Sequence, residues 1–236
     1  MQTAAVIAEV DSQPEAPRTP VAVLRAHWPE YLMEGAELGL FMVSACVFTV
    51  LLEHPSSLAR QSSALFRHFL EGVAMGMTLL ALIFSPWGKR SGAHMNPGFT
   101  LSFYLLGKVG PWDAAFYAIA QFAGAILGVV IAALMLGELV RHPSVNYVAT
   151  VPGPAGPSIA FVAEFFISFI QMSAVLAFSN HKRLSRFTPF IAAGLLAGHR
   201  VLKSLVARLR AQVRLSGERH ARRYGLVAAA QEIAPQ

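Results

Sequence analysis

Cysteine and charge are both scarce in this sequence. Its 236 residues include one cysteine, Cys46, and only 14% of them are charged. A lone cysteine excludes an internal disulfide, and the apolar run around it favours a packed thiol. Soluble domains carry roughly 25% charged residues. Because 55% of the residues are hydrophobic, the composition predicts an integral membrane protein with one spanning domain.

The sequence also lacks the patterns of common enzymes and cofactor sites. No His, Cys, Asp and Glu cluster has metal-ligand spacing, and no Ser/His/Asp grouping or phosphate loop stands out. We therefore expect no enzyme and no cofactor. The net charge of +6 could suggest a nucleic acid partner. Most Lys and Arg, however, fall in short connectors or in the last forty residues, which is typical of membrane topology signals and predicts no nucleic acid.

The N-terminal 30 residues do not resemble a signal peptide. Acidic residues and prolines alternate there, whereas a signal peptide begins with basic residues and continues into an apolar core. We interpret residues 1–30 as a polar arm.

Four apolar runs approach the roughly 20 residues that a bilayer requires. We predict a transmembrane helix in each of the ranges 32–52, 70–87, 113–140 and 158–179. A fifth run, 187–199, has 13 residues. It would cover about 20 Å, against a hydrocarbon core of about 30 Å.

The stretch SGAHMNPG (91–98) lies between the second and third predicted spans. The apolar residues 98–106 follow it and are too few to cross a bilayer. Pro suits a first helical turn and Asn suits the cap before it, so we predict a re-entrant half-helix. Irregular backbone at membrane depth is tolerated where it lines a water-filled cavity, which indicates a pore.

Connector charges predict the topology. With the N-terminus inside, eight Lys and Arg lie in inside connectors and three lie outside, as the positive-inside rule requires. The inside residues are Arg18, Arg25, Lys89, Arg90, Lys108, Lys182, Arg183 and Arg186, and the outside ones are Arg60, Arg67 and Arg141.

Two carboxylates occupy matching places in the first and fourth spans. Glu37 and Glu164 each follow an alanine near the start of an apolar run, 127 residues apart. Charged side chains inside a membrane usually face the interior of the bundle. Their separation by three spans suggests inverted repeats.

The stretch SGAHMNPGFTLSF resembles the first signature of the aquaporin, or major intrinsic protein, family, SGAH-x-NPA-x-T. The following GKVGPWDAAFYAIAQFAGAILG is similar to that family's third helix. The resemblance implies an all-α membrane protein, with an aquaporin-like bundle of helices and re-entrant half-helices over residues 31–199. It also implies a homotetramer in the lipid bilayer and a channel for water or small neutral solutes such as glycerol, and it suggests a bacterial inner membrane.

The resemblance also implies roles for particular residues. Asn96, Pro97 and Gly98, with Gly in place of the family's Ala, would form the pore motif, and Gly92, Ala93 and His94 would shape the loop before it. Glu37 and Glu164 would brace the re-entrant loops through buried hydrogen bonds. The selectivity filter would take either Met75 or Gly76 from the second span, and His199 lies near the position of another filter residue.

The second half departs from the family pattern. No asparagine follows Asn180, so a second Asn-Pro-Ala motif and a sixth helix have no counterparts and this half is expected to be incomplete. For the basic tail, 200–236, we favour a truncation or reading-frame shift in the gene. The alternative is that the tail begins with an amphipathic helix on an anionic membrane surface. The charge of the tail predicts that it stays cytoplasmic and that the fifth run does not span by itself.

The alternative to a channel function is a non-conducting remnant or a membrane interaction subunit.

Overall fold

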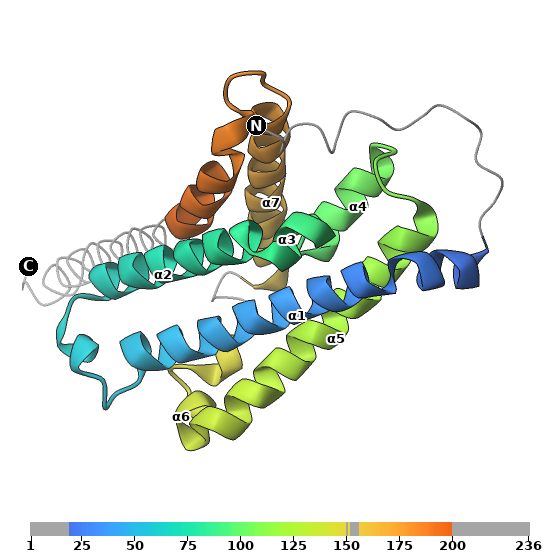
Figure 1. The fold of residues 1–236 in the computed structure, drawn as a ribbon. Helices are drawn as coiled ribbons and strands as arrows, with labels where there is room; N and C mark the ends of the chain where they lie inside the picture. Colours follow the sequence, from blue (N-terminus) through green and yellow to red (C-terminus); the bar gives the residue numbers. More distant parts are fainter. Residues whose placement is uncertain (1–18, 150, 152–155, 200–236) are drawn as a thin grey trace, which may run out of the picture.

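Helices make up all the regular structure in the part of the chain that the structure describes. The computed structural model describes residues 19–149, 151 and 156–199, and no strand occurs among them. The predicted all-α class is therefore confirmed (Figure 1). The helices are α1 (Pro20–Glu53), α2 (Ala64–Phe84), α3 (Pro86–Ser91), α4 (Pro97–Leu105), α5 (Pro111–Leu136), α6 (Glu138–Arg141) and α7 (Pro157–Ser179), with short 3-10 turns at Leu58–Gln61, Asn146–Val148 and Ser185–Phe187.

Four of these helices are long and apolar enough to cross a membrane. They are α1, α2, α5 and α7, and each contains most of one predicted apolar run. A further helix covers residues 188–199 and matches the fifth run. Residues 200–236, with the amphipathic helix predicted there, lie outside the described residues, so whether the fifth run spans stays a prediction.

The first helix begins earlier than its apolar run. Thr19 caps it, since its hydroxyl accepts the N–H of Ala22 at 3.3 Å, and Pro20 occupies the first turn. Residues 20–30 are therefore helical, which corrects the prediction of a polar arm over 1–30. The apolar run is shorter than the helix because capping residues, and not hydrophobicity, set where a helix starts. At about 1.5 Å per residue, α1 is roughly 50 Å long and exceeds the hydrocarbon core.

Helix α2 also begins before its apolar run, because its charged residues are paired. Ser63 caps the helix through the N–H of Phe66 at 3.3 Å. Arg67 is only 6% exposed, and its Nε donates to Glu53 at the end of α1 at 3.0 Å. Pairing lowers the cost of burying a charge, so the helix can extend through a segment that the composition places outside the membrane.

Glycines allow α1 and α5 to cross at close range. Figure 1 shows the two helices lying against each other over much of their length. A Cβ atom on Gly35 would lie 2.8 Å from the carbonyl oxygen of Ala120, and one on Gly39 would lie 2.9 Å from that of Gly124. Both separations are shorter than side chains tolerate. Small residues at such crossings are typical of membrane helices, where close packing replaces the hydrophobic drive between helices.

Helix α2 packs in the same way against the helix of residues 188–199. A Cβ on Gly72 would lie 2.6 Å from the carbonyl oxygen of Ala197, and one on Gly76 would lie 3.0 Å from that of Ala193. The two helices are therefore antiparallel neighbours.

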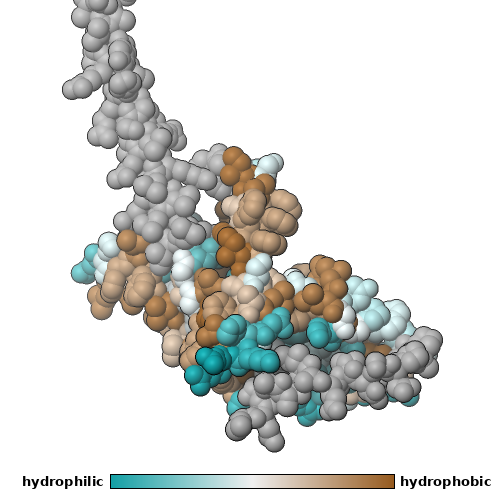
Figure 2. All heavy atoms as spheres, turned by 90° about the horizontal axis from the view of Figure 1, so that it is seen from above, coloured by the Kyte–Doolittle hydropathy of each residue, from teal (hydrophilic) through white to brown (hydrophobic). Residues whose placement is uncertain are grey.

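Hydrophobic side chains cover much of the outer surface. Figure 2 shows brown, hydrophobic residues spread over the face in view. On α7, Phe161 is 73% exposed and Phe169 is 60% exposed. An apolar outer surface of this extent fits helices that face lipid or a neighbouring subunit. Cys46 is fully buried beside Val50 and Ala132, as the prediction of a packed thiol requires.

Candidate functional site

The loop between α3 and α4 has an unusual backbone. Gly92 has φ +94°, and two residues with side chains, Ala93 and Met95, also have positive φ, at +49° and +45°. Left-handed conformations at non-glycine residues cost on the order of 1–3 kcal/mol each. Such a loop persists only if its surroundings hold it in place, and they do so from two helices.

Asn96 ends this loop and caps the half-helix α4. Its backbone is extended, and its side-chain Oδ1 accepts the N–H of Gly98 at 2.7 Å. Pro97 follows in the first turn, as predicted. Asn96 is exposed, and its Nδ2 group makes no hydrogen bond with other described residues. A Cβ on residue 98 would lie 3.1 Å from Asn96 Oδ1, so glycine there leaves room for the cap.

Two buried carboxylates of α1 hold the loop. Glu37 Oε2 accepts the hydroxyl of Ser91 at 3.1 Å. Glu34 Oε1 accepts the backbone N–H of Met95 and also the Nε2–H of Gln121 at 2.9 Å. Both glutamates are 0% exposed. The strained Met95, next to Asn96, is therefore fixed by Glu34.

Sequence reasoning found Glu37 but missed Glu34. The signal in the sequence is the spacing of Glu34 and Glu37. Residues three apart lie on the same face of a helix, so this spacing predicts a second carboxylate on the side of α1 that faces the loop. The Ala-Glu pair directed attention to Glu37 alone.

Helix α5 holds the same loop from the other side. The hydroxyl of Tyr117 donates to the carbonyl oxygen of Ser91 at 2.6 Å, and Gln121 Nε2 donates to Thr100 Oγ1 at 3.1 Å. His94 Nδ1 lies 3.1 Å from the same Thr100 hydroxyl. The His94 ring stacks on Phe103 with centroids 4.9 Å apart. His94 thus contacts two residues of α4 from within the loop, and its role in shaping a pore loop stays a prediction.

The predicted filter residues do not all meet. Met75 is 4% exposed and Gly76 packs on Ala193. His199 lies six residues beyond Ala193, which is about 9 Å further along the helix axis. The structure therefore does not bring His199 level with Gly76, and the filter assignment stays a prediction. Glu164 lies half-buried on α7, and its role as a brace also stays a prediction.

The site offers hydrogen-bond donors and no metal centre. Within the described ranges, no group of three or more His, Cys, Asp or Glu side chains could hold a metal ion. What the α3–α4 loop presents is the exposed amide of Asn96 and the positive dipole end of a half-helix. This arrangement can bind and orient a neutral molecule that carries an oxygen acceptor.

Comparison with known proteins places this arrangement in a family. The sequence profile of the major intrinsic protein family matches residues 23–208. Aquaporin NIP1-4 of Oryza sativa subsp. japonica is 37% identical over 123 residues, covering 52% of this chain and 42% of that protein. Aquaporin NIP2-3 of Zea mays is 31% identical over 166 residues, covering 68% of this chain and 50% of that protein.

A bacterial relative matches a shorter segment more closely. Aquaglyceroporin AqpS of Rhizobium meliloti (strain 1021) is 46% identical over 63 residues, which is 27% of each chain. The chain spans about half the length of the first curated relatives that it matches. Because the family profile covers most of the sequence, including the braced α3–α4 loop and the half-helix, this chain belongs to the major intrinsic protein family.

Proposed function

We propose that this chain is a membrane channel subunit of the aquaporin type, for passive passage of water or small neutral solutes such as glycerol. The observation that carries the proposal is the half-helix α4, whose start is capped by an exposed Asn96 and fixed by buried partners on two helices. The family match and the names of the relatives support a channel over an enzyme.

The proposed mechanism follows from the groups at the start of α4. Asn96 would direct its Nδ2–H bonds at the oxygen of a permeating molecule, because its Oδ1 is already used by the Gly98 N–H. The positive end of the half-helix dipole would add a positive field at the same place. A water held by its oxygen loses some freedom to pass protons onward, and the positive field disfavours cations.

We further propose a cytoplasmic N-terminus, a bacterial inner membrane and a homotetramer. The eight-to-three distribution of connector charges supports the orientation. The exposed apolar side chains of α7 would be covered by lipid or by a neighbouring subunit. The similarity to a Rhizobium protein supports the bacterial membrane.

A second candidate is a non-conducting membrane subunit. One specific observation favours it: residues 181–236 contain no asparagine, so these 236 residues include no second Asn-Pro-Ala motif to face Asn96. A constriction built from one half-helix would leave one wall of the pore without donors.

Stopped-flow light scattering on proteoliposomes separates the two candidates. Vesicles holding the full chain are exposed to sucrose and to glycerol gradients, and shrinkage is compared with that of protein-free vesicles. Channel function predicts faster shrinkage, which Asn96→Ala reduces and Asn180→Ala leaves unchanged. Asn180 is the matched control, because it caps α7 through Nδ2 to the carbonyl of Leu176 at 2.9 Å, outside the site. Shrinkage equal to that of empty vesicles, with the protein shown to be inserted, would reject the channel and favour the second candidate.

A further inference from the structure

Three cations and a serine lie close together in the connector after α7. Helix α7 ends at Ser179, and the chain turns there and returns as the helix of residues 188–199 (Figure 1). The backbone N–H groups of Leu184 and Ser185 both donate to the carbonyl oxygen of His181, at 3.0 Å. This closed turn gathers four side chains around one surface hollow of about 330 Å³, and the lining residues are Lys182, Arg183, Ser185 and Arg186.

The three cations have no acidic partner within the described part of the chain. No Asp or Glu occurs between Glu164 and Glu218 in the sequence, and the ion pairs among the described residues all involve other cations. The Arg186 guanidinium lies 4.7 Å from the centroid of the Phe187 ring, a contact with the face of the guanidinium that leaves its N–H groups free to donate. The positive charge around the hollow is therefore available to an anion.

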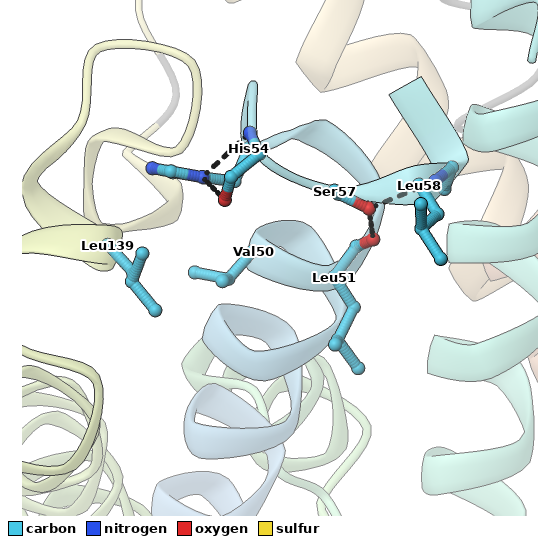
Figure 3. Close-up of a pocket in the computed structure, with 8 residues that line it drawn as sticks. Val50, Leu51, His54, Ser57, Leu58 and Leu139 are labelled. Atoms are coloured by element: carbon cyan, nitrogen blue, oxygen red, sulfur yellow. Dashed lines mark hydrogen bonds between the residues drawn. The ribbon is translucent and has the colours of Figure 1, made fainter. Parts of the chain in front are cut away.

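A second surface hollow, between the end of α1 and Leu139 of α6, has no comparable charge (Figure 3). Its polar groups bind within its own wall: His54 Nδ1 lies 2.7 Å from the Ser56 hydroxyl, and the Ser57 hydroxyl donates to the carbonyl oxygen of Leu51. Among the described residues, no Lys or Arg lines it. Unpaired positive charge is thus a property of the connector after α7 and not of every hollow.

Apolar side chains accompany the cations at the end of a helix that can span a membrane. Helix α7 is one of the four candidate spans, and Arg186 lies seven residues beyond its end at Ser179. The side chains of Leu184, Phe187 and Phe190 are exposed. At the boundary of a bilayer, such apolar side chains enter the acyl region while Lys and Arg reach the headgroups. We therefore expect the hollow at the level of the lipid headgroups.

From these observations we propose that the connector binds the phosphate group of an anionic phospholipid, such as phosphatidylglycerol. Arg183 and Arg186 bind the phosphate oxygens with paired N–H donors, and Lys182 adds a point charge. The Ser185 hydroxyl donates a further hydrogen bond. The volume of about 330 Å³ is at the lower end of small-molecule sites, about 300–1,000 Å³, and suits a headgroup. The exposed apolar side chains contact the acyl chains, which a free phosphate ion lacks.

The test titrates the full chain in detergent with three ligands and measures binding by native mass spectrometry. The ligands are dioctanoyl phosphatidylglycerol, dioctanoyl phosphatidylcholine, which has the same acyl chains and no net charge, and inorganic phosphate. We expect phosphatidylglycerol to bind about tenfold more tightly than either of the others. Equal binding of phosphatidylcholine would show that acyl chains alone drive the contact, and equal binding of inorganic phosphate would show a site for free anions. Either result would overturn the proposal.

Substitutions then locate the site. Each of Lys182→Gln, Arg183→Gln and Arg186→Gln should weaken phosphatidylglycerol binding about fivefold, and the triple variant about a hundredfold, because each Lys or Arg near an anionic headgroup contributes separately. The side chains of these three residues are exposed, so the variants should fold, and gel filtration and circular dichroism verify this.

The matched control is Lys108→Gln, because Lys108 is exposed in the connector between α4 and α5 and does not line the hollow. This variant should bind phosphatidylglycerol like the parent protein. A triple variant whose affinity matches that of Lys108→Gln would overturn the proposal. Binding in detergent does not depend on permeability, so the result stands apart from the proposed channel function.

Discussion

Replacing Gly124 with alanine would place a methyl group in the closest part of the α1–α5 crossing. A Cβ atom there would overlap the backbone carbonyl of Gly35. A backbone carbonyl cannot rotate away as a side chain can, so the helices must separate. We therefore expect the new methyl group to destabilise the protein although alanine favours helices.

The magnitude follows from two opposing effects. Overpacking a close contact costs about 1–3 kcal/mol, and the backbone obstacle points to the upper end. Alanine in place of glycine gains about 1 kcal/mol in a helix interior. The net loss is about 2 kcal/mol in the free energy of unfolding. In a chain of this size 1 kcal/mol corresponds to about 2–4 °C, so Tm should fall by about 6 °C.

The single cysteine provides the assay. Cys46 is fully buried in the α1–α5–α6 cluster, so a thiol-reactive dye becomes fluorescent only as the protein unfolds. Gly194→Ala is the matched control, because a Cβ on Gly194 meets nothing within 4 Å and its helix gains about 1 kcal/mol. Its Tm should rise by about 3 °C. A Tm for Gly124→Ala at or above that of the parent protein would refute the close crossing.

Three further substitutions test the polar contacts. Tyr117→Phe removes the hydroxyl that donates to the Ser91 carbonyl at 2.6 Å and should lower the free energy of unfolding by about 1 kcal/mol; an unchanged Tm would contradict this bond. Glu34→Ala leaves the buried N–H of Met95 without its acceptor and should lower the free energy of unfolding by about 1–3 kcal/mol. We expect faster proteolysis between α3 and α4, and cleavage at the rate of the parent protein would show that Glu34 does not hold the loop. Glu53→Gln leaves the buried Arg67 without its carboxylate and should lower the free energy of unfolding by about 3 kcal/mol. A Tm within 2 °C of the parent value would show that the Arg67–Glu53 ion pair contributes little to stability.

The points at which α1 and α2 begin depend on pairing and capping interactions that a count of hydrophobic residues along the sequence does not include. Arg67 is charged, yet it lies inside α2 because Glu53, fourteen residues earlier, pairs with it. Residues 20–30 carry Arg25, His27 and Glu30, yet they are helical because Thr19 and Pro20 start the helix before the predicted apolar run. The hydrophobic runs therefore predicted which spans exist, and they predicted the beginnings of α1 and α2 less well.

Sequence alone determined the features that come from local chemistry. Hydrophobic length predicted four spans, and Asn96-Pro97 predicted the start of a half-helix, because a cap and a fixed proline φ act within a few residues. Only the tertiary structure decided which distant groups meet: Glu34 with Met95, Gly35 with Gly124, and His54 with His142. Those contacts depend on the register and crossing of packed helices, and a shift of one residue would turn each side chain by about 100° around its helix axis.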